Sequence, residues 1–260
     1  MEVIVARTAA EMSVAAAREV ADVLNAKPNA VLGMATGSTP LGLYQELVRL
    51  HKKGGLDFSH VTTFNLDEYV GLPITHPQSY HHFMHEHLFR HVNIPAQNIH
   101  IPSGTTTNYR AFCAWYEARI KECGGIDLQI LGIGTDGHIG FNEPGSSLTS
   151  RTRLKTLARQ TIDDNARFFK NREEVPIYAI TMGVGTVLEA REIVLLANGK
   201  KKAGAIAAAV EGPVTSMITA SALQLHPSSR VYVDEEAAAQ LKMREYFDWV
   251  QEKKPGAPQV

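Results

Sequence analysis

The chain reads Ile126-Asp-Leu-Gln-Ile-Leu131 and then, without a break, Gly132-Ile-Gly-Thr-Asp-Gly-His-Ile-Gly-Phe-Asn-Glu-Pro144. The first part is a largely apolar run of the kind that forms buried strands. The second part, the glycine-rich turn, has glycines that permit positive φ and let the backbone approach a ligand closely. Open α/β sheets bind their ligands just beyond the carboxyl ends of their strands. The stretch therefore predicts an α/β fold with a functional site in this turn.

Similar apolar runs recur along the chain and alternate with segments of helical spacing. That alternation predicts βαβ units on a mostly parallel sheet. Several runs are continuous, as in strands that helices cover on both faces. We expect a single α/β domain over residues 1–260, a three-layer sandwich around a doubly wound, Rossmann-like sheet. The predicted strands are Val3–Ala6, Ala30–Ala35, Val61–Leu66, Ile99–Ile101, Ile126–Ile133, Ile177–Thr181, Ile193–Ala197 and Arg230–Val233.

Local signals mark several helix starts. Thr8, with Glu11 three residues later, forms a capping-box pattern. Pro40 suits the first position of a helix, because its missing N–H has no intrahelical partner there. Asn108 predicts the start of a helix that runs to Glu122.

Composition limits the classes of protein. Lysine and arginine total 26 against 27 aspartates and glutamates, a net charge of −1, which lacks the basic excess of a nucleic-acid binder. Cys113 and Cys123 have no metal-binding spacing and exclude a disulfide framework, so a reducing compartment fits best. No signal sequence or membrane-spanning run is evident. We expect a cytoplasmic protein with no nucleic-acid or membrane partner and a frayed tail at 251–260.

A candidate anion site follows the run at Ala30–Ala35. The chain continues with Thr36-Gly37-Ser38-Thr39-Pro40 and then turns helical. Free backbone N–H groups at a helix start, the positive end of its dipole and nearby hydroxyls together bind phosphate. An ordinary strand-to-helix turn also explains these residues, and the lack of Gly-Lys-Ser/Thr excludes a Walker loop.

Two acids, Asp67 and Glu68, follow the run at Val61–Leu66. Adjacent residues of an extended strand point to opposite faces, so these acids should not both face one ligand. We expect one of them to be structural. For a single acid at a strand end, helix capping competes with catalysis as the explanation.

The glycine-rich turn holds a dense set of titratable groups. Its Gly-x-Gly-x-x-Gly spacing does not indicate dinucleotide binding, because Asp136 would meet the pyrophosphate and a proline follows quickly. His138 lies between Asp136 and Glu143, and a histidine held by carboxylates is a general acid/base unit. The alternative is a loop whose acids only cap backbone groups.

Other polar clusters favour simpler interpretations. Five histidines lie between His81 and His91, but they lack the HExxH order and a third ligand, so we expect a solvated helix face and no metal site. The run Lys200-Lys201-Lys202 is typical of a solvated surface, although one lysine is a candidate partner for the anion. The polar segment 146–174 shows no clear strand and predicts a mobile cover over a site.

Taken together, the motifs resemble the glucosamine-6-phosphate deaminase (glucosamine/galactosamine-6-phosphate isomerase) family over nearly the whole chain. The resemblance rests on an ordered series of motifs, which is more specific than any one of them. They are Ala35–Pro40, Phe64–Tyr69, Gly134–Pro144, Ser150–Thr156, Gly183–Thr186, Ala208–Gly212 and Leu223–Pro227.

The resemblance implies conversion of glucosamine 6-phosphate and water to fructose 6-phosphate and ammonia in amino-sugar catabolism, including that of N-acetylglucosamine, with no metal or organic cofactor. His138 matches the ring-opening base, assisted by Asp136 and Glu143. Asp67 matches the base that removes the proton from C2. The residues that match the family's phosphate site are Gly37, Ser38, Thr39, Arg167 and Lys202. Ser38 stands where some relatives carry glycine, which adds a hydroxyl and should not abolish binding.

Bacterial hexameric members of the family carry an allosteric site for N-acetylglucosamine 6-phosphate at a subunit interface. The resemblance therefore implies an allosteric homohexamer. The matching residues are Ser146, Ser147, Arg153, Lys155, Thr156 and Tyr246.

Two alternatives stay open at this point. 6-Phosphogluconolactonases have a related Gly-x-Asp-Gly-His turn, whereas Phe141-Asn142-Glu143-Pro144 and Asp67-Glu68-Tyr69 look like the deaminase pattern. A non-catalytic sugar-phosphate sensor would keep the phosphate loop and lose acid/base groups. All four candidate catalytic residues are present, which favours the enzyme.

Overall fold

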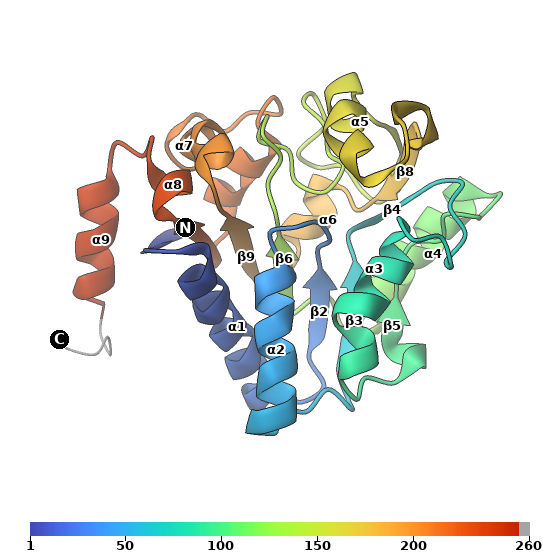
Figure 1. The fold of residues 1–260 in the computed structure, drawn as a ribbon, viewed down its shortest axis with the longest axis horizontal. Helices are drawn as coiled ribbons and strands as arrows, with labels where there is room; N and C mark the ends of the chain where they lie inside the picture. Colours follow the sequence, from blue (N-terminus) through green and yellow to red (C-terminus); the bar gives the residue numbers. More distant parts are fainter. Residues whose placement is uncertain (255–260) are drawn as a thin grey trace.

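The computed structural model describes residues 1–254, and a seven-stranded parallel sheet forms its centre (Figure 1). Each neighbouring pair in this sheet is parallel. The strands are, in spatial order, β1 (Glu2–Ala6), β10 (Ser229–Asp234), β9 (Glu192–Ala197), β6 (Leu128–Leu131), β2 (Val31–Met34), β3 (Thr62–Asn65) and β5 (Ile99–His100).

Helices cover both faces of this sheet, which confirms the predicted three-layer, doubly wound fold. In Figure 1, α1 (Ala9–Ala26) and α2 (Leu41–Gly54) lie in front of the sheet, and α4 (Tyr109–Glu122) and α6 (Val184–Leu188) lie behind it. The remaining α-helices of the described chain are α3 (Tyr80–His87), α5 (Arg159–Asn165), α7 (Ala203–Glu211), α8 (Glu235–Ala238) and α9 (Arg244–Glu252).

The order of the strands reverses between β2 and β6. From β2 the chain proceeds to β3 and β5 on one side, and from β6 it proceeds to β9 and β10 on the other. Such a switch point leaves a crevice outside the carboxyl ends of the two strands, where open α/β sheets bind ligands. Both the candidate anion loop after β2 and the glycine-rich turn after β6 therefore start at this crevice.

The predicted helix starts are present with small corrections. Thr8 accepts the N–H of Glu11 at 3.1 Å, but the Glu11 carboxylate bonds the N–H of Arg7 instead of that of Thr8. Asn108 caps α4 by accepting the N–H three residues on, also at 3.1 Å. Pro40 is the N-cap of α2, one position earlier than expected, because Leu41 is the first residue of that helix.

A second, three-stranded sheet corrects the sequence prediction. It pairs β4 (Asp67–Tyr69) and β7 (Arg153–Thr156) with β8 (Tyr178–Thr181) between them, in antiparallel register. The predicted strand at Ile177–Thr181 therefore lies outside the parallel sheet. The segment 146–174, predicted to lack a strand, contains β7. A single residue separates β3 from β4, so the chain passes from the large sheet to the small one beside Asp67.

Each sheet has its own apolar packing. The main cluster joins the parallel strands to the helices around them, with Leu32, Phe64 and Ile130 fully buried. A smaller cluster under α5 is formed by Tyr69, Phe141, Leu157, Ile162, Val175 and Ala179. It fixes segment 157–175 against β4 and β8, above the carboxyl ends of the parallel strands (Figure 1).

The C-terminal prediction is only partly covered by the structure. Gln251 and Glu252 belong to α9 rather than to a frayed tail, and residues 255–260 lie outside the described residues. Within residues 1–254, no helix has the length and apolar character needed to cross a membrane.

Candidate active site

A cavity of about 330 Å³ opens at the switch point between β2 and β6. Its walls come from the loop after β2, from β4, from the glycine-rich turn, from α3 and from the segment after β7. The structure brings seven of the predicted site residues to this cavity: Gly37, Ser38, Thr39, Asp67, His138, Arg167 and Lys202.

One end of the cavity has the features of an anion site. Gly37, Ser38 and Thr39 precede α2, and no side chain of the described chain caps the start of that helix. Backbone N–H groups at a helix start carry partial positive charge and bind anions. Arg167 and Lys202 line the same cavity from the short 3₁₀ helices Ala166–Phe168 and Lys200–Lys202. Burial lowers the pKa of the Lys202 ammonium, and the charges of Asp164 and Asp136 offset only part of this effect.

Asp67 lies at the start of β4 and is 6% exposed. Burial and, next, the Glu68 charge raise the pKa of its carboxyl to about 8, although the N–H of Phe141 offsets part of the rise. The glycine-rich turn passes close by, since a Cβ on Gly140 would lie 3.3 Å from Asp67 Oδ2. A carboxylate with a raised pKa is a stronger base, and Asp67 faces the cavity where it can act on a ligand.

Glu68 faces the other way, which confirms the prediction that the two acids do not share a ligand. Its carboxylate accepts the N–H groups of Tyr80 and His81, at 3.0 and 3.1 Å, and so caps α3. His85 and His87 lie exposed on α3, as expected for a solvated helix face. His81 instead contacts Glu68 through its ring.

The glycine-rich turn holds His138 against two carboxylates. Its Nδ1 lies 2.7 Å from Asp136 Oδ1 and 3.7 Å from Glu143 Oε2. A Cβ on Gly134 would lie 2.4 Å from the His138 ring, so glycine is required for the ring to fold back over the turn. Burial raises the pKa of the Asp136 carboxyl, but the contact with His138 outweighs it and the net pKa is lowered.

Asp136 and Glu143 do not line the cavity, whereas His138 does. Both acids therefore lie behind the ring and orient it. The three groups offer ligand atoms within 4.8 Å of one another, close enough for a cation. Because only the histidine reaches the cavity, the arrangement fits proton transfer by the ring better than three-point binding of an ion.

Only some of the residues matched to the allosteric site lie near one another in the structure. Arg153 and Lys155 alternate with exposed residues along β7 and so share one face, while Thr156 points to the opposite face. Ser146 is buried and its Oγ has no hydrogen-bond partner within the described chain; Ser147 follows it directly. Tyr246 lies exposed on α9, at the opposite side of the molecule from β8 (Figure 1), so it does not join the others within one chain.

The sequence analysis missed several residues that line the cavity, among them Tyr80, Asp164 and Asn198. Asn198 directly follows β9, so its position at the carboxyl end of a parallel strand was an available signal. Tyr80 and Asp164 had no local signal, because α3 and α5 reach the cavity only through tertiary packing.

A cavity that can hold an anion at one end and exchange protons at two other points defines an enzyme of phosphorylated small molecules. The chain belongs to the family of glucosamine-6-phosphate isomerases and 6-phosphogluconolactonases, whose model matches residues 5–238.

Individual relatives narrow the family. A glucosamine-6-phosphate deaminase of Shewanella woodyi is 51% identical over 251 residues, which cover 96% of this chain and 95% of the relative. A solved monomeric glucosamine-6-phosphate deaminase has 45% identity and a TM-score of 0.91, over 92% of this chain and all of the other. A solved 6-phosphogluconolactonase from Trypanosoma cruzi has a TM-score of 0.74 at 20% identity, over 93% of this chain and 97% of the other, which shows a shared fold alone.

Proposed function

We propose that this enzyme is a glucosamine-6-phosphate deaminase, which converts glucosamine 6-phosphate and water to fructose 6-phosphate and ammonia. The observation that carries the proposal is the presence of two separate proton-transfer groups, Asp67 and His138, in one cavity with an anion site. An amino-sugar phosphate needs both groups, because its ring must open before the proton on C2 becomes acidic.

His138 performs the first step. The ring opens when the anomeric hydroxyl loses its proton and the ring oxygen gains one, which a single imidazole can do by taking one proton and giving the other. Asp136 and Glu143 lie within 3.7 Å of its Nδ1 and stabilise the imidazolium between these transfers. The product of this step is the open-chain aldehyde, whose C1 carbonyl makes the proton on C2 acidic.

Asp67 performs the second step. It takes the C2 proton while the C1 oxygen gains a proton, and the result is an enolamine, in which C1 and C2 share a double bond. Return of a proton to C1 gives an imine at C2, and water hydrolyses this imine to the ketone with release of ammonia. The raised pKa of Asp67, about 8, makes the carboxylate a strong enough base for a carbon acid.

The phosphate fixes the sugar for both steps. Gly37, Ser38 and Thr39 offer N–H and hydroxyl groups from the start of α2, and Arg167 and Lys202 supply positive charge. The Arg167 guanidinium can donate two parallel hydrogen bonds to phosphate oxygens. It stacks on Phe168, with 4.6 Å between its Cζ and the ring centroid, which limits where it can point.

Ammonia release from glucosamine 6-phosphate by the purified protein tests this proposal, with 6-phosphogluconolactone as a parallel substrate. Lactone hydrolysis removes no proton from carbon, so it needs no base in the position of Asp67. Lactone turnover without ammonia release contradicts the deaminase assignment. Binding of glucosamine 6-phosphate with neither reaction indicates the non-catalytic sensor.

The proposal extends to regulation, assembly and location. It includes activation by N-acetylglucosamine 6-phosphate, a homohexamer and a cytoplasmic location in amino-sugar catabolism. The shared face of Arg153 and Lys155 and the unpartnered hydroxyl of buried Ser146 support an anion site on β7. Tyr246 can join that site only from another subunit, because α9 is distant within one chain.

The 45% identical deaminase is monomeric, which weighs against the hexamer. Light scattering measures the mass in solution directly. Substrate saturation curves with and without N-acetylglucosamine 6-phosphate should differ in shape or half-saturation, and identical curves remove the activation.

A further inference from the structure

Glu68 is a buried carboxylate with no task in the mechanism above. It is 1% exposed and follows Asp67 directly on β4, with its side chain on the opposite face of that strand. A charge in this position is expensive unless it is well bonded. Its bonding therefore indicates what it does.

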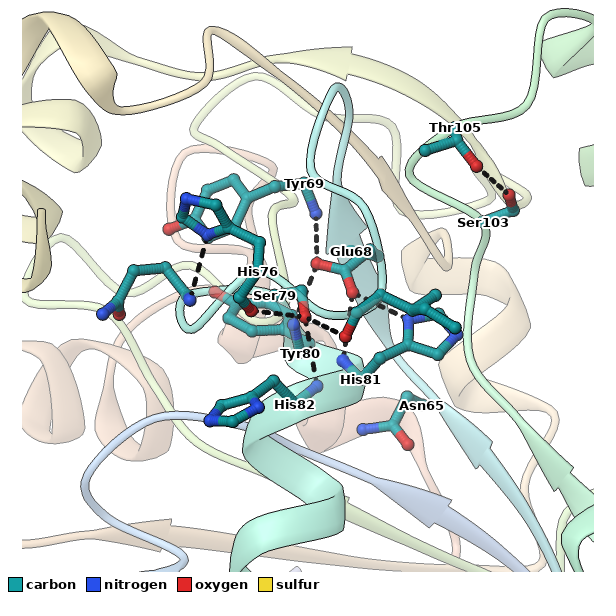
Figure 2. Close-up of polar contacts among 12 residues, drawn as sticks. Asn65, Glu68, Tyr69, His76, Ser79, Tyr80, His81, His82, Ser103 and Thr105 are labelled. Atoms are coloured by element: carbon teal, nitrogen blue, oxygen red, sulfur yellow. Dashed lines mark hydrogen bonds and ion pairs between the residues drawn. The ribbon is translucent and has the colours of Figure 1, made fainter.

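The Glu68 carboxylate is held at every available point (Figure 2). Oε1 accepts the N–H of Tyr69 at 2.9 Å and that of Tyr80 at 3.0 Å. Oε2 accepts the N–H of His81 at 3.1 Å and lies 2.9 Å from His81 Nδ1. One side chain thus joins β4 to the first turn of α3.

This bonding fixes the start of α3 completely. Glu68 takes the first two free N–H groups of the helix, and Ser79 Oγ accepts the third, from His82, at 3.1 Å. Helix starts favour carboxylates, since free N–H groups and the helix dipole both present positive charge there. The first turn of α3 cannot move away from β4 without breaking these bonds.

Tyr80 transmits this anchoring to the cavity. Its backbone N–H bonds Glu68, while its side chain lines the cavity next to Asp67. Its ring stacks on Phe141 of the glycine-rich turn, with centroids 6.1 Å apart and planes at 12°. The aromatic wall that Tyr80 and Phe141 form in the cavity of Asp67 thus depends on Glu68 for its position.

Glu68 also sets the electrostatic surroundings of Asp67. After burial, its charge is the next cause of the raised pKa of Asp67. The other ionisable groups near Asp67 are the buried hydroxyls of Tyr69, Tyr80 and Tyr116, whose pKa values are raised so that they stay neutral, and His138, Arg167 and Lys202 across the cavity. Glu68 is therefore the negative neighbour that keeps Asp67 basic.

We propose that Glu68 is a positioning residue for proton transfer at Asp67, an inference that rests on the function proposed above. It holds the first turn of α3, and with it the Tyr80 wall, and it places a fixed negative charge behind the base. A simple helix cap shares the first role and lacks the second.

Glu68→Gln separates these roles, because glutamine keeps the length and loses the charge. The direct readout is the titration of the Asp67 carboxyl, followed by carbon-13 NMR of labelled aspartate and assigned by its absence in Asp67→Asn. We expect the midpoint to fall by about one pH unit in Glu68→Gln. The acid limb of kcat/KM for ammonia release should move by the same amount.

Glu86→Gln is the matched control, since it removes a carboxylate that lies on α3 itself and pairs with Arg90. Its titration and its activity should equal those of the wild type. Glu68→Asp keeps the charge and withdraws it by about 1.5 Å, one C–C bond. We expect its Asp67 midpoint to stay within about 0.3 unit of the wild type and its KM to rise at least about threefold, because the Tyr80 wall loosens.

An unchanged Asp67 midpoint in Glu68→Gln overturns the proposal and leaves a helix cap. Should that variant not fold, a normal KM in Glu68→Asp overturns it instead. Because the NMR titration needs no turnover, a protein that releases no ammonia fails the proposed function while the effect of Glu68 on Asp67 is still decided.

Discussion

Asp67 and His138 line one cavity but lie in opposite electrostatic surroundings. Asp67 is a carboxyl next to another carboxylate, on a strand buried under aromatic rings. His138 is an imidazole on a glycine-rich turn, with carboxylates 2.7 and 3.7 Å from its Nδ1. Burial and a like charge disfavour the charged form of Asp67, whereas the two carboxylates beside His138 hold its ring in place.

The difference matches two different proton transfers. Removing a proton from C2 of a sugar needs a strong base, and a carboxylate becomes one when its charge is disfavoured. Opening the ring needs a group that can accept a proton and soon give it back, which suits an imidazole that carboxylates hold in place. One cavity supplies both because the two groups come from different sheets and loops.

Among the substitutions that test this comparison, Asp67→Asn should have the largest effect on activity. Asparagine keeps the shape of the side chain and removes the base, so kcat for ammonia release should fall about 10³–10⁴-fold. Exchange of the C2 proton with solvent should stop as well. Calorimetric titration with a sugar phosphate checks that binding persists, and turnover near the wild-type rate would end the role given to Asp67.

His138→Gln should have a smaller effect, a loss in kcat of about 10²–10³-fold, because aminosugar rings also open slowly without a catalyst. In this variant, ring opening should become the rate-limiting step. With ring opening limiting, substrate deuterated at C2 should react as fast as the protiated form. A full C2 isotope effect in His138→Gln would mean that the two groups act in the same step, which contradicts the division proposed here.

The sequence predicted the parallel sheet because each of its strands is a local apolar run, and it predicted the site because the groups follow such runs directly. Only one residue lies between the end of β3 and Asp67, and the glycine-rich turn begins at the end of β6. The small sheet escaped prediction for a physical reason. Its strand β7 carries Arg153 and Lys155 and has no fully buried residue, so it forms through pairing with β8 rather than through its own pattern.

The position of Glu68 shows the same limit. Strand alternation predicted that it faces away from Asp67, which the structure confirms. Its partners on α3 could not be predicted, because they lie 12 and 13 residues away and meet it only when α3 packs on β4. A charge that acts on a site only through tertiary packing produces no recognisable residue spacing in the sequence.

The pH dependence of kcat/KM sharpens the comparison further. With a pKa of about 8 in the free enzyme, Asp67 is mostly protonated at neutral pH and must ionise to act. We expect kcat/KM to fall about tenfold for each pH unit below 8. A profile of kcat/KM measured from pH 5 to 9 at constant ionic strength tests this. An acid limb near pH 4 would show that Asp67 titrates like an exposed carboxyl.

The smallest expected effect concerns stability and has opposite signs for two aspartates of the site. The pKa of Asp67 is raised in the folded state, to about 8, so folding favours its protonated form. Its contribution to stability is present at low pH, declines as pH rises above the unfolded value of about 3.9, and is fully lost above pH 8. Asp67→Asn should therefore raise the free energy of unfolding by about 1–3 kcal/mol at pH 8 and change it little at pH 4.

For a chain of this size, that gain corresponds to a rise in Tm of roughly 3–8 °C. The pKa of Asp136 is lowered by His138 despite burial, so its contribution is present above its unfolded pKa and is lost as pH falls. Asp136→Asn should therefore lower the Tm at pH 8, where Asp67→Asn raises it. Thermal unfolding of both variants at pH 4 and pH 8 decides the matter: a lower Tm for Asp67→Asn at pH 8 would mean that the buried carboxylate is stabilised by its surroundings, and the contrast with the His138 side of the cavity would fail.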